Sequence, residues 1–285
     1  MATPKTDFPP IRACLFDMDG LLINTEDIYT HCHNILLAKY GAGPMTWDIK
    51  SQLQGRPAHL AITLLLTHFS LLPQVSIPDY TTQLHIIQEI EFLKAAPLPG
   101  VSDLLSQLSV AKTITGQKVH LALATSSSTP HYNLKTSHLP TLFSHFPASQ
   151  KVLGDDPRIP PGRGKPHPDI YHLALRTINA SIDARNSGVS VEQREELIKP
   201  EECLVFEDGI PGVVSGRRAG MRVVWCPHEG LAGLWKGRED EVLAGWGEGR
   251  NVSEGDVGEL GDGWGEKRVT LEGFDWARYG VIVDQ

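Results

Sequence analysis

The chain has 285 residues, of which 41% are hydrophobic and 21% are charged. This ordinary globular composition is sufficient for one large domain or two smaller ones. The formal net charge of -8 argues against a surface for nucleic acids, and no apolar run is long enough to predict a membrane-spanning helix. An anionic substrate would therefore need local positive charge, from a metal or from particular Lys and Arg side chains.

The first ten residues, MATPKTDFPP, lack the apolar stretch of a secretory signal. Four cysteines, at positions 14, 32, 203 and 226, are scattered without a C-x-x-C pair. We interpret them as thiols in a reducing compartment rather than as a disulfide framework. The sequence thus predicts a cytoplasmic protein, and we expect it to be a monomer.

Short apolar runs recur along the chain, and most are separated by segments with helical patterning. This alternation predicts an α/β fold in which helices cover both faces of a parallel sheet. Such sheets carry their chemistry just beyond the carboxyl ends of the strands. The runs occupy residues 11–16, 119–124, 151–153, 203–206 and 222–225.

Residues 26–95 have a different pattern. They contain the helical stretches EDIYTHCHNILLAKYG and YTTQLHIIQEIEFLKAA, which end near Gly41 and Pro97. No strand-like run interrupts them convincingly. We expect an all-helical cap at 25–97, inserted into a core formed by residues 1–24 and 98–285.

Two further segments are expected to be peripheral. Residues 179–200 are polar and predict a loop with one short helix. Residues 246–267 are rich in glycine and acidic residues, which is typical of a flexible surface excursion. A last strand and helix are predicted near 269–280.

Four polar clusters each follow an apolar run, so all four should meet at one edge of the sheet. They are DMDG with Asp17 and Asp19, LATSSS with Thr125 and Ser126, GKPHPDIY with Lys165, and VFEDGIPG with Glu207 and Asp208.

These side chains form a chemically coherent set. Asp17, Asp19 and Asp208 offer oxygen ligands for a hard cation such as Mg²⁺. A Thr hydroxyl and backbone N–H groups can hold phosphoryl oxygens, and a lysine can neutralise developing charge. One carboxylate can attack phosphorus while its neighbour handles the proton. Two crowded carboxylates are costly unless a cation or a reaction uses them.

Each cluster also has a purely structural interpretation. A lone D-x-D is often a turn, Thr125 and Ser126 can cap a helix, and a lysine is most often solvated. The four clusters in this order after strands favour a site. No zinc pattern competes, because His31 and His33 diverge on a helix. The sequence has no G-x-x-x-x-G-K-[ST] loop, so ATP binding of that type is not predicted.

The stretches FDMDGLL, LATSS, GKPHPDIY and LVFEDGIPGV resemble the four motifs of the haloacid dehalogenase-like hydrolases. The resemblance covers residues 10 to about 228. Within that superfamily the chain is similar to the pseudouridine-5'-phosphatase group, through WDIKSQLQGR in the cap, LATSSS…KTS, and LFSHF…VLGDDPRI…GKPHPDI.

The resemblance implies a Rossmann-like, doubly wound parallel sheet with a helical cap inserted after the first strand. It implies that Asp17 is the nucleophile and that Asp19 protonates the leaving alcohol and then activates water. Asp17, the backbone carbonyl of Asp19 and Asp208 would hold Mg²⁺, with Glu207 acting through a bound water.

The resemblance further implies that Thr125 and Ser126 orient phosphoryl oxygens and that Lys165 pairs with the phosphate and Asp17. The cap stretch LQGRPAH offers Arg56 and His59 as candidate substrate contacts. Two departures stand out. Asn24 replaces the usual Asp before Thr25, which could alter cap hinging. Residues 209–211, Gly-Ile-Pro, could alter the loop that orients Asp208.

The leading hypothesis is a Mg²⁺-dependent phosphatase of a small phosphorylated metabolite. A nucleoside or sugar monophosphate is expected, with pseudouridine 5'-phosphate as the first candidate. A phosphosugar mutase of the same superfamily would share all four clusters. A non-catalytic binding protein is disfavoured, because that fate usually removes the nucleophile or a metal ligand.

Overall fold

The computed structural model describes residues 2–54, 58–247 and 258–283. Six strands form a sheet in the order β4-β3-β1-β5-β6-β7, and every neighbouring pair is parallel. The predicted α/β class and the five predicted strands are confirmed. The strands are β1 (Ala13–Phe16), β3 (His120–Ala124), β4 (Lys151–Val152), β5 (Cys203–Glu207), β6 (Arg222–Trp225) and β7 (Gly265–Lys267).

The central strand β1 is buried on both sides. Side chains of a strand point alternately to opposite faces. Cys14 and Phe16 therefore join one apolar cluster, together with side chains of α5 (Val101–Val110). Ala13 and Leu15 join the other, with α8 (Asp169–Asn186) and α9 (Ile210–Arg218). Helices on both faces make the sheet doubly wound, and this explains why the strand reads as a continuous apolar run.

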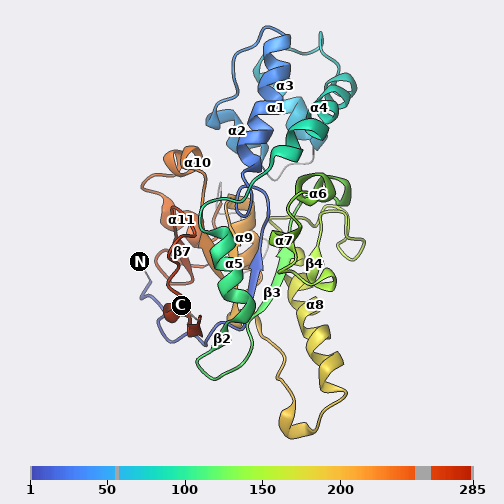
Figure 1. The fold of residues 1–285 in the computed structure, drawn as a ribbon. Coiled ribbons are helices and arrows are strands. Elements are labelled where there is room, and N and C mark those ends of the chain that lie inside the picture. Colours follow the sequence, from blue (N-terminus) through green and yellow to red (C-terminus); the bar gives the residue numbers. More distant parts are fainter. Residues whose placement is uncertain (1, 55–57, 248–257, 284–285) are drawn as a thin grey trace.

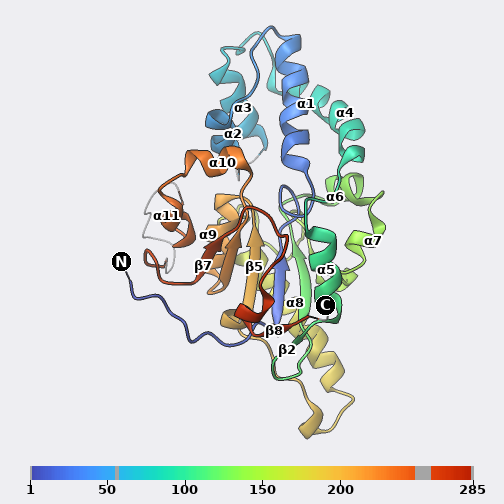
Figure 2. The ribbon, with the colours of Figure 1, turned by 60° about the vertical axis from the view of Figure 1, so that its left-hand side comes forward.

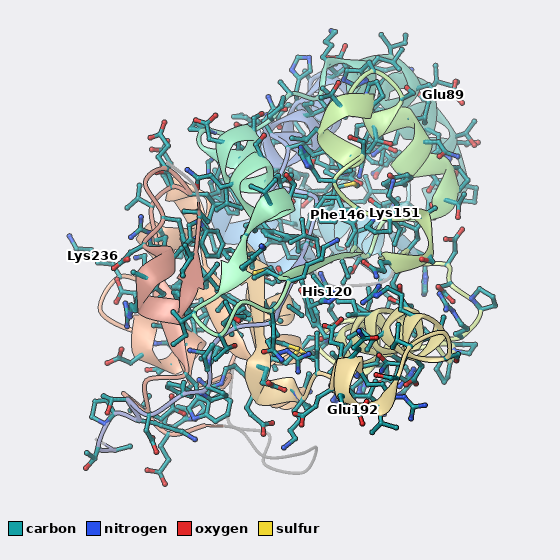
Figure 3. The ribbon with its side chains drawn as sticks, turned by 60° about the horizontal axis from the view of Figure 1, so that its bottom comes forward. Glu89, His120, Phe146, Lys151, Glu192 and Lys236 are labelled. Atoms are coloured by element: carbon teal, nitrogen blue, oxygen red, sulfur yellow. The ribbon has the colours of Figure 1, made fainter. Side chains whose placement is uncertain are left out.

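Shorter elements complete the core. The two-residue strands β2 (Lys112–Thr113) and β8 (Val281–Ile282) pair antiparallel. Figure 3 shows Glu89 of the inserted helices and Glu192 near the end of α8 at opposite ends of the molecule. The remaining core helices are α6 (Thr129–Thr136), α7 (Pro140–Phe143), α10 (Glu229–Leu234), α11 (Glu239–Leu243), η2 (Ala148–Gln150), η3 (Val191–Gln193), η4 (Pro200–Glu202) and η5 (Trp276–Tyr279).

The segment inserted after β1 is helical in all its regular elements among the described residues, as predicted. It lies beyond one end of the sheet, with α6 of the core below α4 (Figure 1, Figure 2). Its elements are α1 (Thr25–Lys39), α2 (Trp47–Leu53), α3 (Ala58–His68), α4 (Ile77–Glu91) and η1 (Phe92–Lys94). The boundaries of a cap domain at residues 25 and 97 stay a prediction.

The two crossings between the core and these helices lie side by side. Ile23 forms an isolated bridge with Pro97. Asn24 exchanges two hydrogen bonds with Ala96: its N–H donates to the Ala96 carbonyl at 3.0 Å, and its side-chain oxygen accepts from the Ala96 N–H at 2.8 Å. The side-chain oxygen of Asn24 therefore stabilises this crossing. An aspartate at this position would offer an equivalent acceptor oxygen.

The structure corrects two predictions. Residues 179–186 continue α8, so the loop predicted at 179–200 begins only after Asn186; polar exposed positions had hidden the apolar face of this helix. Within 246–267, described in part, residues 265–267 form the edge strand β7 instead of a surface excursion. No strand lies within 269–280, where the last strand was predicted: β7 precedes this stretch and β8 follows it at 281–282, whereas the predicted helix is present as the short η5 (Trp276–Tyr279).

Two further observations concern membrane spans and cysteines. None of the helices in the described ranges is long and apolar enough to cross a membrane. All four cysteines are free thiols; Cys226 is partly exposed and the other three are buried.

Candidate active site

Three carboxylates meet at the carboxyl edge of the sheet. Asp17 directly follows β1, Glu207 is the last residue of β5, and Asp208 comes next. One oxygen from each lies within 4.8 Å of the others, and all three side chains are buried. β1 and β5 are adjacent parallel strands, so their ends deliver these groups to one place. The clusters DMDG and VFEDGIPG were predicted to meet at this edge, and the structure confirms that they do.

Two glycines allow this close approach. Gly20 has a φ of +80°, a conformation that favours glycine, and a Cβ there would lie 2.3 Å from Asp208 Oδ2. Gly212, in the first turn of α9, lies against Glu207: an added Cβ would be 1.8 Å from Glu207 Oε1. The sequence DMDG and the glycine that follows Pro211 therefore leave room for the carboxylates.

Lys165 is the cation among these acids. Its buried ammonium pairs with Asp17 Oδ1 and lies 2.6 Å from Glu207 Oε1. The Tyr171 hydroxyl donates to the same Glu207 oxygen at 2.5 Å. Three buried carboxylates thus face one ammonium, which leaves the cluster short of positive charge.

The pKa values reflect this imbalance. Burial, opposed by Lys165 and reinforced by Glu207 and Asp19, raises the pKa of Asp17 to about 7. Burial, with the nearby negative charge of Glu26 and Asp17, also raises the pKa of Asp208 well above its ordinary value. A divalent cation would relieve both effects, and an all-oxygen donor set suits Mg²⁺. The residues present therefore fit a hard cation.

The Asp19 side chain has hydrogen-bond partners of its own. Its Oδ1 accepts hydrogen bonds from Thr25 Oγ1 and Lys135 Nζ, both at 2.6 Å, and its Oδ2 accepts from Ser127 Oγ at 2.6 Å. Although burial opposes it, Lys135 and the two hydroxyls lower the pKa of Asp19. Its predicted metal contact, the backbone carbonyl, stays a prediction.

Sequence reasoning missed Lys135 and Ser127. Both lie in stretches that carried the resemblance, LATSSS and KTS, but neither was assigned a role. The spacing gave no signal that Lys135, seven residues beyond LATSSS, reaches back to Asp19.

The other predicted site residues differ in exposure. Thr125 is buried, and its hydroxyl accepts a hydrogen bond from the Ser127 N–H at 3.1 Å. Ser126 is exposed at the end of β3. Arg56 lies outside the described residues, and His59 is exposed in the first turn of α3.

A cavity of about 240 Å³ lies on the other side of Gly20, between the start of α1 and the loop after β6. Three carboxylate residues, Glu26, Asp27 and Glu229, line it. Glu26 lies 2.8 Å from the Lys50 ammonium and Asp27 lies 3.2 Å from the His228 ring, so two of these three carboxylates have basic partners of their own.

Comparison with known proteins identifies the class. A family model of haloacid dehalogenase-like hydrolases matches residues 11–220. The match covers most of the chain, which therefore belongs to this family, as the four motifs predicted.

Individual relatives indicate which kinds of enzyme the chain is similar to. The chain is 43% identical to a probable pseudouridine-5'-phosphatase of Saccharomyces cerevisiae, over 84% of this chain and 91% of that protein. It is 31% identical to (DL)-glycerol-3-phosphatase 1, mitochondrial, of Arabidopsis thaliana, over 82% and 70%. A solved structure assigned as a beta-phosphoglucomutase of Thermotoga maritima has a TM-score of 0.54 at 25% identity, over 82% and 97%. The predicted enzyme class, phosphoric monoester hydrolase, is confirmed by the family and by the phosphatase relatives.

Replacing Gly212 by alanine should disturb the acidic group. The new Cβ collides with Glu207, which Lys165 and Tyr171 hold in place. We expect a loss of about 1–3 kcal/mol in the free energy of unfolding, the usual cost of overpacking, measured by urea denaturation. Gly233→Ala, in α10 with open space around it, is the control and should be neutral or slightly stabilising. Wild-type stability in Gly212→Ala would contradict this packing.

Stability without divalent cations should depend on Asp17. Because its folded pKa is raised to about 7, the native state binds more protons than the unfolded state up to that pH. This contribution to stability is complete below the unfolded pKa and is lost as the pH rises through about 7. We expect the Tm of EDTA-treated protein to fall as the pH rises from about 4 to about 7, the interval between the unfolded and folded pKa values of Asp17, more steeply than that of Asp17→Asn, and the difference between the two slopes to vanish above about pH 8. Equal slopes for the two proteins would refute this assignment.

Proposed function

We propose that the protein is a Mg²⁺-dependent phosphatase that hydrolyses a small phosphorylated metabolite through an aspartyl-phosphate on Asp17. One observation carries the proposal: Lys165 bridges Asp17 and Glu207 beside Asp208, within a buried acidic group that is short of positive charge. A cation and a phosphoryl group would give these costly carboxylates a use.

In the first step an Asp17 carboxylate oxygen attacks phosphorus. The carboxylate is activated by position and by ionisation, and Lys165 offsets its repulsion from the incoming phosphate. The bond between phosphorus and the alcohol oxygen breaks. Asp19, ionised in the free protein, would take up a proton when the negatively charged phosphate enters the site, and gives that proton to the alcohol oxygen. The products are the free alcohol and phosphate bound covalently to Asp17.

In the second step water attacks the phosphorus of the aspartyl-phosphate. Asp19, now ionised, accepts a proton from this water, and the bond between phosphorus and the Asp17 oxygen breaks. Inorganic phosphate leaves, and both aspartates return to their starting states. Thr125 and Ser126 would hold phosphoryl oxygens during both steps.

The metal ligands of this proposal are Asp17, Asp208 and the backbone carbonyl of Asp19, with Glu207 acting through a water molecule. Bound Mg²⁺ would offset the charge of the carboxylates and of the phosphoryl oxygens.

The names of the relatives guide the choice of substrate. Pseudouridine 5'-phosphate is the first candidate, from the yeast relative, and a polyol phosphate is suggested by the plant glycerol-3-phosphatase. The test is a panel of nucleoside, sugar and polyol monophosphates with Mg²⁺, scored by phosphate release. No release from any of them, or from p-nitrophenyl phosphate, would refute the proposal.

A phosphosugar mutase is the second candidate, favoured by the similarity to the Thermotoga maritima structure. A mutase must hold a second anionic group of its substrate and exclude water. Transfer of ³²P between sugar positions, without release of inorganic phosphate, would favour it. The cytoplasmic location and the monomeric state predicted from the sequence stay predictions.

Asp17→Asn should abolish turnover and leave the fold intact. The amide keeps the shape of the carboxylate but is a far poorer nucleophile and a weaker ligand. We expect no phosphate release above background from p-nitrophenyl phosphate, with unchanged circular dichroism. Asp103→Asn, an exposed carboxylate on α5, is the control and should keep wild-type activity. Beryllium fluoride with Mg²⁺ should inhibit the wild type by mimicking the acyl phosphate.

Asp19→Asn should affect substrates unequally. General acid–base groups contribute about 10²–10⁴-fold in rate, and good leaving groups need little protonation. The value of kcat/KM, which reports the first phosphoryl transfer, should fall strongly for glycerol 3-phosphate and much less for p-nitrophenyl phosphate. Equal losses for the two substrates would count against Asp19 as the acid.

A further inference from the structure

Lys135 is a buried cation outside the acidic group of Asp17, Glu207 and Asp208. It lies in the last turn of α6 and is fully buried, with 0% of its surface exposed. Its ammonium donates to Asp19 Oδ1 at 2.6 Å, to the Tyr29 hydroxyl at 2.7 Å and to Ser127 Oγ at 2.8 Å. All three donors of the ammonium are therefore satisfied, and one partner is the proposed acid and base.

The contacts of Lys135 also join the core to the inserted helices. Tyr29 lies at the start of α1 and Phe92 at the start of η1, so one follows the first crossing and the other precedes the second. The Lys135 ammonium lies 4.6 Å from the centre of the Tyr29 ring and 4.7 Å from that of Phe92. The two rings contact each other edge to face at 5.0 Å.

The Asp19 carboxylate is held through both oxygens. Lys135 and Thr25 bind Oδ1, and Ser127 binds Oδ2, while Lys135 also binds Ser127. Removing the ammonium would leave the carboxylate with hydroxyl donors alone and would take from Ser127 Oγ the hydrogen bond that it accepts from Lys135. The bare methylenes of another side chain could fill the space but could not fix the orientation of the carboxylate.

We propose that Lys135 is a positioning residue for Asp19, which fixes the carboxylate for proton transfer and ties its position to that of the inserted helices through Tyr29 and Phe92. The proposal rests on the role given to Asp19 in the proposed function. It assigns to Lys135 no contact with substrate and no share in metal binding.

The test compares Lys135→Met with Lys151→Met. Lys151, labelled in Figure 3, is a matched control. It too lies over a tyrosine ring, that of Tyr132 at 5.6 Å, but it is partly exposed and forms no hydrogen bond or ion pair with Asp19. In Lys135→Met, kcat/KM for glycerol 3-phosphate should fall about ten- to a hundredfold, within what general acid–base catalysis contributes. For p-nitrophenyl phosphate the loss should stay below about threefold. Lys151→Met should match the wild type for both substrates.

A double-mutant comparison separates positioning from a general structural role. If Lys135 acts through Asp19, the two changes are coupled, and adding Lys135→Met to Asp19→Asn should cost little further activity on glycerol 3-phosphate. Equal losses on both substrates in the single variant, or an additive loss in the double variant, would overturn the proposal.

Two further measurements keep the test decisive. Loss of a buried ion-pair partner can destabilise the chain, so Tyr29→Phe, which removes one hydrogen bond and keeps the ring, serves as a milder variant. In Tyr29→Phe, kcat/KM should again fall more for glycerol 3-phosphate than for p-nitrophenyl phosphate, but both losses should be smaller than in Lys135→Met. Independently of activity, amide hydrogen exchange at residues 24–30 and 92–96 should quicken in Lys135→Met and not in Lys151→Met.

These readouts separate two failures. If the wild type releases no phosphate from any substrate, the proposed function fails, and the exchange comparison still decides whether Lys135 couples Asp19 to the inserted helices. If the wild type is active but exchange is unchanged in Lys135→Met, the inference about Lys135 fails by itself.

Discussion

The site depends on an excess of buried negative charge at one edge of the sheet. Asp17, Glu207 and Asp208 share a space that a single ammonium, Lys165, only partly neutralises. Such a group is unfavourable for the stability of the empty protein, since each carboxylate is desolvated and faces another. The parallel sheet supplies the rigidity that holds it together: β1 and β5 pair along their length, and their ends have no freedom to separate. Function is thus obtained at a cost in stability.

Features encoded by short stretches of sequence were predictable. The core strands are continuous apolar runs, and a polar cluster follows most of them, so a parallel topology alone brings Asp17 and Asp208 to one edge. β7 escaped prediction because an edge strand needs backbone pairing and little side-chain pattern. The full length of α8 escaped because its exposed positions are polar. Local patterning identified elements wherever burial on both faces imposed a strong apolar signal.

Contacts between distant parts of the chain were the hardest to predict. Lys165 stands in a motif, so its role could be inferred, whereas Lys135 stands in an ordinary helix turn. Its importance comes from the burial of its ammonium among Asp19, Tyr29 and Phe92, residues separated from it by up to 116 positions. No spacing rule links these positions. The sequence indicated which residue types could perform the proposed chemistry, but the side chains that contact Asp19 emerged only from the packing.

The paired crossings at Asn24 and Ala96 bear on how such an enzyme can change. Because the two points already exchange hydrogen bonds, a segment of any length inserted between them begins and ends at one place, and closing it requires little extra loop entropy. The helices at 25–94 are therefore a module that could be exchanged in evolution without rebuilding the sheet. Their replacement is constrained at its two ends, since a new segment must again provide aromatic partners for the buried ammonium of Lys135. The middle of the module can thus vary while its ends are retained.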